Sequence, residues 1–293
     1  MLKMVINYSL PSLADGLNTI LIYNHIDATM NLDRQKIEQL VISVAKTEIL
    51  PRFNQVERQY KTDGSIVTEA DHIVQLKLQQ AFKELCPDTV LLGEEMTAEQ
   101  QQALFDSGQA LWCLDPVDGT SNFAAGVPYF AVSLALIDQG EIVFGLVYDP
   151  IHDECFSAVK GQGAWLNNEK LNLKNTGFNL KQTIALIDFK RLPKSMATQL
   201  VTDIPFGSQR SLGSIALELC WIAAGRAHIY LHGKQQLWDY AAAQLILLEA
   251  GGMARTLENE PVYNKTLSSR STIAAVDQNL FNEWLYYLNN VEQ

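Results

Sequence analysis

The sequence predicts a two-part fold, with an α+β first half over residues 33–180 and an α/β second half over residues 181–293. In the first half, apolar runs are joined by short polar turns, which is typical of a mostly antiparallel sheet beside two or three helices. In the second half, strand-like and helix-like segments alternate along the chain. Residues 1–32 show neither pattern, so we treat them as an N-terminal extension of uncertain structure.

Helical signals come first along the chain. Asp33 can cap a first helix, whose apolar residues keep helical spacing until Pro51 ends the run. A second helix is predicted over residues 71–85, where apolar side chains share one face. Thr97 and Gln100 have the spacing of a capping box, which predicts a third, short helix.

Short apolar segments of the first half are predicted to be strands. They cover residues 89–92, 110–114, 131–137, 141–148, 154–159 and 164–166. Asp138-Gln139-Gly140 is a hairpin signal, and Gly161 and Gly163 turn the chain farther along. We therefore expect most of these strands to form an antiparallel meander.

The second half should alternate strands with helices. The predicted strands are 183–188, 227–231, 253–256 and 272–276, and the predicted helices are 214–224, 239–250 and 279–288. Gly251 and Gly252 are a C-cap signal for the helix before them. This alternation favours a sheet with helices packed on its faces.

The composition is that of a globular protein. Its 293 residues are 47% hydrophobic and 19% charged, which argues against disorder, collagen and coiled coil. A net charge of -11 argues against a nucleic-acid partner. The four cysteines lack CxxC spacing, which argues against a zinc site or a disulfide scaffold. No apolar run reaches about 18 residues and no signal peptide is evident, so we expect a cytoplasmic protein without a membrane partner.

Carboxylates gather at three boundaries between predicted elements. Glu94-Glu95 follow one strand, Asp115 and Asp118 follow the next, and Asp239 precedes a helix. Side chains at strand ends face the crevice where ligands usually bind. Taken singly, these segments are equally typical of a turn, a solvated loop and a helix cap. The prediction of a site depends on all three occurring together.

The second of these segments carries the most chemical information. Pro116 keeps Asp115 extended, so that Asp115 and Asp118 can turn toward one point, and Gly119 permits a tight turn. Thr120-Ser121-Asn122 then favours the start of a helix, whose free amides suit a phosphate. Carboxylates beside a phosphate are how proteins usually hold magnesium.

Together these segments resemble the signature of the inositol monophosphatase superfamily. The matching residues are Glu94-Glu95, Asp115-Pro116-Val117-Asp118-Gly119-Thr120, and Trp238-Asp239 with Ala242. Further similarity lies in Asp63 to Asp71, in Gly213-Ser214-Ile215-Ala216 and in Ala223-Ala224-Gly225. The resemblance covers roughly residues 34–285. It implies a layered α-β-α-β-α sandwich of the inositol monophosphatase and fructose-1,6-bisphosphatase type. It also implies a magnesium-dependent, lithium-sensitive phosphomonoesterase that forms a homodimer.

The resemblance also implies a role for each matched residue. Two or three Mg²⁺ ions would be held by Glu94, Asp115, the Val117 carbonyl, Asp118 and Asp239. Glu94 and Thr120 would orient the attacking water, and Asp71 would hold Thr120. The phosphate would be bound by the amides of Gly119, Thr120 and Ser121. Substrate contacts are expected from Gly213, Ser214, Ile215 and His232.

Three functions remain open at this point. The default is hydrolysis of inositol monophosphate, a small phosphorylated metabolite. The second is a phosphatase for 3'-phosphoadenosine 5'-phosphate or a sugar bisphosphate. The third is a non-catalytic regulatory or RNA-associated protein on the same scaffold, which would require lost metal ligands, and none is lost here.

One departure from the family pattern bears on the choice of substrate. Inositol-selective members resembling this chain carry a glutamate six residues before the Trp-Asp pair, where this sequence has His232. Neutral imidazole cannot replace both oxygens of a carboxylate, and Lys234 adds a positive charge nearby. We therefore expect weaker selectivity for inositol monophosphate. The alternative is that His232 and Lys234 merely lie on a solvated loop.

Overall fold

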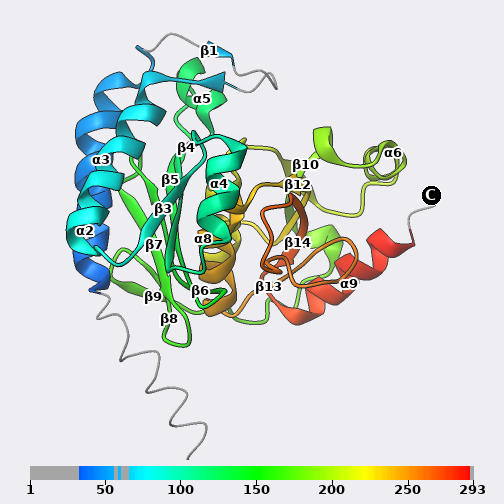
Figure 1. The fold of residues 1–293 in the computed structure, drawn as a ribbon. Coiled ribbons are helices and arrows are strands. Elements are labelled where there is room, and N and C mark those ends of the chain that lie inside the picture. The colour runs from blue at the N-terminus through cyan, green and yellow to red at the C-terminus, as the bar shows by residue number, and fades with distance from the viewer. Residues whose placement is uncertain (1–32, 56–58, 61–65, 291–293) are drawn as a thin grey trace, which may run out of the picture. The chain divides into compact units, whose positions relative to one another are not determined.

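The computed structural model describes residues 33–55, 59–60 and 66–290 (Figure 1). The expected N-terminal extension, residues 1–32, lies outside the described residues, as do residues 61–65 at the start of the first matched motif. Contacts divide the chain into Met1–Ile37 and Glu38–Gln293. Helix α2 (Arg34–Val44) crosses this boundary, and all other described elements belong to the second unit.

In the described part of the first half, most strands form one seven-stranded sheet in the order β3-β4-β5-β6-β7-β8-β9. Its strands are β3 (Val90–Gly93), β4 (Leu111–Asp118), β5 (Ala131–Asp138), β6 (Glu141–Asp149), β7 (Glu154–Val159), β8 (Gly163–Leu166) and β9 (Glu169–Leu171). β3 and β4 are parallel, and all other neighbouring pairs are antiparallel, which confirms the expected meander. Three very short strands, β9, β1 (Gln59–Tyr60) and β2 (Ile66–Val67), were not predicted.

Strand β4 continues farther than the sequence indicated. The expected strand ended at Leu114, but β4 runs on to Asp118. Its pairing with β5 shifts register between Asp115 and Asp118. Pro116 lies in this interval and has no N–H to donate to a neighbouring strand, so an irregularity there is expected. As a result, the two aspartates belong to a strand and not to the loop after it.

The described second half forms a five-stranded mixed sheet in the order β11-β10-β12-β14-β13. Its strands are β10 (Ile184–Asp188), β11 (Ser208–Arg210), β12 (Ile229–Gln235), β13 (Met253–Arg255) and β14 (Arg270–Ala275). β10 pairs in parallel with β11 and β12, whereas β14 is antiparallel to β12 and β13. The change from one sheet to the other falls between β9 and β10, near the division expected at residue 180.

The helices agree with the sequence patterns except for α6. They are α3 (Glu69–Leu85), α4 (Ala98–Phe105), α5 (Thr120–Ala125), α6 (Lys194–Thr202), α7 (Ile215–Ala223), α8 (Leu237–Glu249) and α9 (Gln278–Asn289). The described residues also contain short π and 3₁₀ turns, η1 (Ala45–Ile49), η2 (Leu50–Arg52), η3 (Leu180–Gln182) and η4 (Phe189–Arg191). α6 was not predicted; it is nine residues long and buries little besides Leu200.

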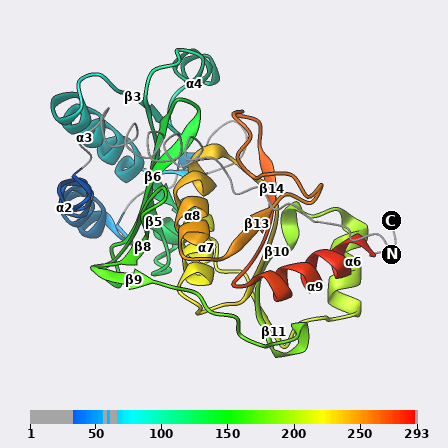
Figure 2. The same ribbon diagram turned by 90° about the horizontal axis from the view of Figure 1, so that it is seen from below.

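The layers confirm the α-β-α-β-α sandwich. Figures 1 and 2 show α3 outside the seven-stranded sheet, α7 and α8 between the two sheets, and α6 and α9 outside the five-stranded sheet. α8 contacts strands β4 to β8 on one side and β13 on the other, so its side chains are buried almost all round. The apolar core therefore continues from one sheet through α7 and α8 to the other.

Close approach of α8 to β6 depends on Gly145. A Cβ added there would lie 2.6 Å from the carbonyl oxygen of Ala242 in α8. Any side chain would push the helix away from the sheet. The start of α8, which carries Asp239, is thus held near the first sheet.

None of the helices among the described residues combines the length and the apolar character that crossing a membrane requires.

Candidate active site

Five carboxylates from separate parts of the chain share one region of the structure. Asp115 shows this most directly: burial raises its pKa well above the usual value, and the charges of the other four raise it further. These four are Glu94 after β3, Asp118 at the end of β4, Asp239 in the first turn of α8 and Asp71 in the first turn of α3. The fold therefore brings together all the predicted carboxylate ligands, and Asp71 with them.

Asp115 and Asp239 are each fixed through a single oxygen. Asp115 is 3% exposed, and its Oδ1 accepts a hydrogen bond of 3.0 Å from the Val117 amide. Oδ2 of Asp239 accepts one of 2.8 Å from the Gln236 amide, within the capping box of α8. No hydrogen bond from the described residues reaches the second oxygen of either carboxylate. That oxygen is oriented and remains available to a ligand.

Asp118 is held from the second half of the chain. Its Oδ2 accepts hydrogen bonds from Ser214 Oγ at 2.6 Å and from the Ala216 amide at 2.7 Å. Burial raises the pKa of Asp118 to about 6, although these hydrogen bonds act in the opposite direction. Ser214 is also the N-cap of α7, where its Oγ accepts from the Leu217 amide. The start of α7 therefore fixes the direction of the Asp118 side chain.

Asp71 has two functions in the structure. Its Oδ2 accepts hydrogen bonds of 2.7 Å from both the amide and the hydroxyl of Thr68, which caps α3. Its Oδ1 lies 3.4 Å from Thr120 Oγ1, which also lies 2.9 Å from the Val117 carbonyl oxygen. Burial raises the pKa of Asp71 to about 7, against the Thr68 hydrogen bonds and with the charges of Glu95 and Glu94. The predicted contact between Asp71 and Thr120 is therefore present.

Two glutamines hold the turn that carries Glu94. Gln101 Nε2 donates to the carbonyl oxygens of Gly93 and Glu94, at 3.0 and 3.2 Å. Gln75 Oε1 accepts from the Glu95 amide, and its side chain lies so close to Gly93 that an added Cβ would collide with it. The sequence pattern did not identify these glutamines, because a glutamine in a helix is usually an ordinary surface residue.

The predicted phosphate-binding residues lie at the start of α5. Gly119 has a φ of +94°, which favours glycine, and forms the N-cap of this helix. Ser121 is exposed and Thr120 is half-buried. The first amides of a helix have no hydrogen-bond partner within it, so they can donate hydrogen bonds to an anion from outside. Phosphate binding by these three amides stays a prediction.

The structure uses the polar groups of the predicted substrate contacts in the α7 turn for internal hydrogen bonds. The Gly213 amide donates to Glu218, whereas Ser214 Oγ donates to Asp118. What the structure assigns to this turn is support of Asp118. Direct contact of Gly213, Ser214 and Ile215 with a substrate stays a prediction.

His232 is a buried strand residue. It lies in β12 with 1% of its surface exposed, so the alternative of a solvated loop was wrong. Its Nδ1 accepts from the Lys234 amide at 3.2 Å, and its Nε2 lies 3.1 Å from Asp188 Oδ2. Burial lowers the pKa of His232, against the effect of Asp188. Both ring nitrogens are therefore engaged within the protein, and contact with a substrate stays a prediction.

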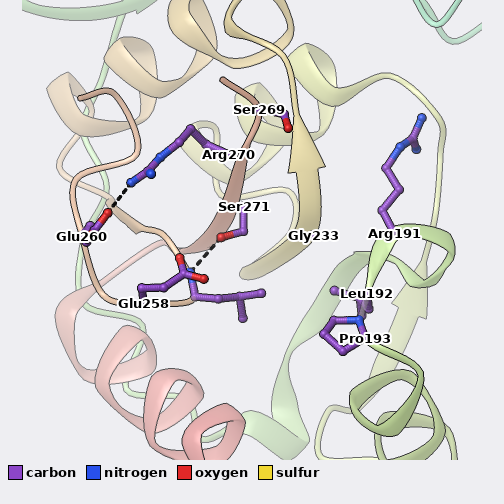
Figure 3. A pocket seen from close by; sticks show the side chains of 10 residues that line it. Arg191, Leu192, Pro193, Gly233, Glu258, Glu260, Ser269, Arg270 and Ser271 are labelled. Carbon is purple, nitrogen blue, oxygen red and sulfur yellow. Dashed lines mark hydrogen bonds and ion pairs between the residues drawn. The ribbon is translucent and has the colours of Figure 1, made fainter. Parts of the chain in front are cut away.

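A polar cavity of about 460 Å³ borders β12 at Gly233 (Figure 3). It is lined by Gly233, which follows His232 in β12, and by Arg191, Arg270, Ser269, Ser271 and Glu258 among others. Arg191 Nη1 pairs with Asp188, and Arg270 pairs with Glu260. The charge of Arg191 also acts to lower the pKa of Asp239, though less than burial raises it.

The donor set fits magnesium. All the candidate ligands are oxygen atoms, and the buried carboxylates repel one another, a repulsion that a divalent cation would relieve. In the part of the chain that the structure describes, no three Asp, Glu, His or Cys side chains enclose an ion by themselves. Mg²⁺ is usually bound by one or two carboxylates together with water and substrate phosphate.

A dependence of stability on pH follows from these carboxyls. Asp118 and Asp71 have folded pKa values of about 6 and about 7, whereas an unfolded aspartate titrates near about 3.9. Between these values the native state holds more protons than the unfolded state, so stability must fall as the pH rises. We expect the melting temperature in EDTA to fall from about pH 5 to about pH 8, and Mg²⁺ to restore it most at the higher pH. Identical pH profiles of the melting temperature with and without Mg²⁺ would contradict the interpretation that these carboxylates bind a common cation.

Comparisons with known proteins point to one family. The model of the "Inositol monophosphatase family" matches residues 29–291. The chain is 34% identical over 212 residues to the "Nus factor SuhB" of Pasteurella multocida, which covers 69% of this chain and 76% of the relative. It is also 34% identical over 233 residues to the "Inositol-1-monophosphatase" of Bacillus subtilis, which covers 76% and 84%.

A solved structure shows the same fold. An IMPase of Thermotoga maritima superimposes with a TM-score of 0.76 at 26% sequence identity. The match covers 88% of this chain and 97% of that one.

Proposed function

This chain belongs to the inositol monophosphatase family, and from that premise we propose that it is a magnesium-dependent phosphatase with inositol monophosphate as its substrate. The observation that carries the proposal is the buried carboxylate cluster beside the start of α5. Asp115 and Asp239 are each fixed through one oxygen, which leaves the other for a cation. Gly119 turns the chain so that the first amides of α5 follow directly.

Each residue of the cluster has a part in the proposed reaction. Mg²⁺ would be held by Glu94, Asp115, the Val117 carbonyl, Asp118 and Asp239. When bound, it polarises the phosphate and lowers the pKa of a water ligand. Thr120 and Glu94 orient the attacking water, and Asp71 holds the Thr120 hydroxyl in place. The amides at the start of α5 bind the phosphate oxygens as their negative charge grows.

Phosphate release from a substrate panel tests this function. The panel contains inositol 1-phosphate, fructose 1,6-bisphosphate and 3'-phosphoadenosine 5'-phosphate, each with Mg²⁺ or with EDTA. We expect Mg²⁺-dependent release, with inositol 1-phosphate among the accepted substrates. Release that continues in EDTA would contradict the metal mechanism. No release from any member of the panel would favour the non-catalytic alternative.

The cavity at Gly233 favours a second candidate, a substrate with two anionic groups. The side chain of Arg191 is 44% exposed, Arg191 lines the cavity, and its charge acts to lower the pKa of Asp239. A guanidinium that pairs with one carboxylate still has further N–H groups for a phosphate. The two glutamates of the lining weigh against strong anion binding, so inositol monophosphate remains the first candidate.

Arg191→Ala separates these two candidates. If the cavity binds a second phosphate, kcat/KM for the bisphosphorylated substrates should fall by about tenfold or more, since a hydrogen bond to a charged group contributes about 1.5–3 kcal/mol. The efficiency for inositol 1-phosphate should change little. Arg210→Ala, at an exposed arginine of β11, is the matched control. Equal losses on all substrates would show that Arg191 does not select among them.

Lithium inhibition is expected, because every motif carboxylate that the resemblance requires is present. Activity should fall when lithium chloride replaces sodium chloride at the same ionic strength. The loss should depend on the Mg²⁺ concentration, since both cations would use the same carboxylates. Equal activity in the two salts at every Mg²⁺ concentration would contradict it.

Location and partners belong to the proposal as well. We infer a cytoplasmic homodimer, which size-exclusion chromatography with light scattering would test for its oligomeric state. The expected absence of a nucleic-acid partner needs its own test, because the Pasteurella relative is named a Nus factor and not a phosphatase. Binding of RNA by the purified protein at physiological salt would contradict that expectation.

A further inference from the structure

Glu218 is a buried carboxylate that the proposed reaction does not use. It lies in α7 with 3% of its surface exposed. Its Oε1 accepts hydrogen bonds from the amides of Leu212 at 2.6 Å and Gly213 at 3.2 Å. Within the described residues no lysine, arginine or histidine pairs with it. Burial raises the pKa of this carboxyl group to about 7, although the two amides act in the opposite direction, and a buried carboxyl group without a cationic partner costs stability.

The turn that Glu218 holds contacts two parts of the candidate site, helix α5 and the side chain of Asp118. The Leu212 carbonyl accepts a hydrogen bond of 2.7 Å from Asn122 Nδ2, which also lies 2.8 Å from the Tyr129 carbonyl. Asn122 belongs to α5, the helix whose start carries the predicted phosphate-binding amides. On its other side, the turn continues into Ser214, whose hydroxyl binds Asp118.

The turn also packs directly against the phosphate-binding segment. A Cβ at Gly119 would lie 3.2 Å from the Gly213 carbonyl oxygen, which leaves little room between the two segments. Gly213 itself has a φ of +86°. Little space therefore separates this turn from Gly119. A small shift of the turn would move both Ser214 and the Gly213 carbonyl group that packs against Gly119.

We propose that Glu218 is a positioning residue, which holds the Leu212 and Gly213 amides so that Ser214 keeps Asp118 aimed at the cation. The inference rests on the proposed function, because it assumes that Asp118 is a metal ligand. One oxygen of the Glu218 carboxyl group accepts both amides, so it fixes Leu212 and Gly213 relative to each other. Support of a ligand by such a partner commonly changes metal affinity by about 10–100-fold.

Three variants test the inference. Glu218→Ala removes the acceptor, Glu218→Gln keeps a neutral oxygen at the same place, and Leu219→Ala removes a buried core side chain of the same helix. Mg²⁺ affinity is measured by titration calorimetry in the presence of inorganic phosphate, and stability by thermal melting. We expect Glu218→Ala to weaken Mg²⁺ binding by about 10–100-fold and Glu218→Gln to restore most of it. Leu219→Ala should lower the melting temperature without changing Mg²⁺ affinity.

A double-mutant cycle with Asn122→Ala sharpens the test. Both side chains hold the same turn, so the double variant should lose less Mg²⁺ affinity than the product of the two single losses. Independent losses would overturn the inference, as would Mg²⁺ binding by Glu218→Ala equal to that of the unmodified protein. If Leu219→Ala loses as much Mg²⁺ affinity as Glu218→Ala, the loss follows from general damage to α7, and Glu218 has only a structural role. If the unmodified protein binds no Mg²⁺, the proposed function fails as well.

Discussion

Asp115→Asn should abolish nearly all phosphatase activity while raising the stability of the metal-free protein. Polarisation of the phosphate by a bound metal ion stabilises the transition state by several kcal/mol. Without this ligand, kcat/KM should therefore fall by about a thousandfold or more. Asparagine keeps an oxygen that can accept the 3.0 Å hydrogen bond from the Val117 amide, so the strand should not change. Removing one charge relieves the repulsion from Glu94, Asp118 and Asp239. The measurements are phosphate release at saturating Mg²⁺ and the melting temperature in EDTA.

The combination of results distinguishes a lost ligand from a damaged fold. Asp239→Asn should behave in the same way, because its carboxylate is fixed through the Gln236 amide and its pKa is raised by burial and by Asp118. Asp138→Asn, at the end of β5 in the hairpin turn, is a control that should leave activity unchanged. Near-normal turnover in Asp115→Asn would contradict its assignment as a ligand.

Thr120→Val should lower kcat by about 100-fold to 10,000-fold, the range expected when a group that directs proton transfer is lost. Valine has nearly the same shape but no hydroxyl, so the contacts with Asp71 Oδ1 and the Val117 carbonyl both disappear. Mg²⁺ affinity should fall much less than kcat, because the carboxylate ligands stay in place. Single-turnover phosphate release at saturating Mg²⁺ and substrate measures the effect.

Thr120→Ser is the matched control, since it keeps the hydroxyl and removes only a methyl group. It should retain activity within about tenfold of the unmodified protein. If Thr120→Val and Thr120→Ser lose the same activity, packing of the methyl group explains the loss and the hydroxyl has no part in the reaction.

Local patterns predicted most of the fold. The hairpin at Asp138-Gln139-Gly140 joins β5 and β6 as expected, and Gln139 and Gly140 both have positive φ there. The capping box of Thr97 and Gln100 opens α4. α6 and β11 escaped detection because a short helix with few buried residues and a three-residue strand carry almost no periodic signal.

Local patterns likewise predicted only part of the candidate site. Its carboxylates were identified because Asp115, Asp118 and Glu94 occur in short motifs at element boundaries, which local sequence can reveal. The residues that hold them were not identified. Gln101 and Glu218 act on residues brought to them by the fold, and a single polar residue within a helix has no sequence signature of such a role.

The sequence by itself determined the classes of element, the order in which they occur and the carboxylates that we propose as magnesium ligands. It did so because periodicity, turns and motifs depend on neighbours along the chain. Tertiary structure alone decided that His232 is buried against Asp188 and that Ser214 binds Asp118. The pairing of β10 with β12 places Asp188 beside His232, and α7 begins where Asp118 ends its strand. Contacts of this kind depend on how separate elements pack, so no local pattern along the chain contains them.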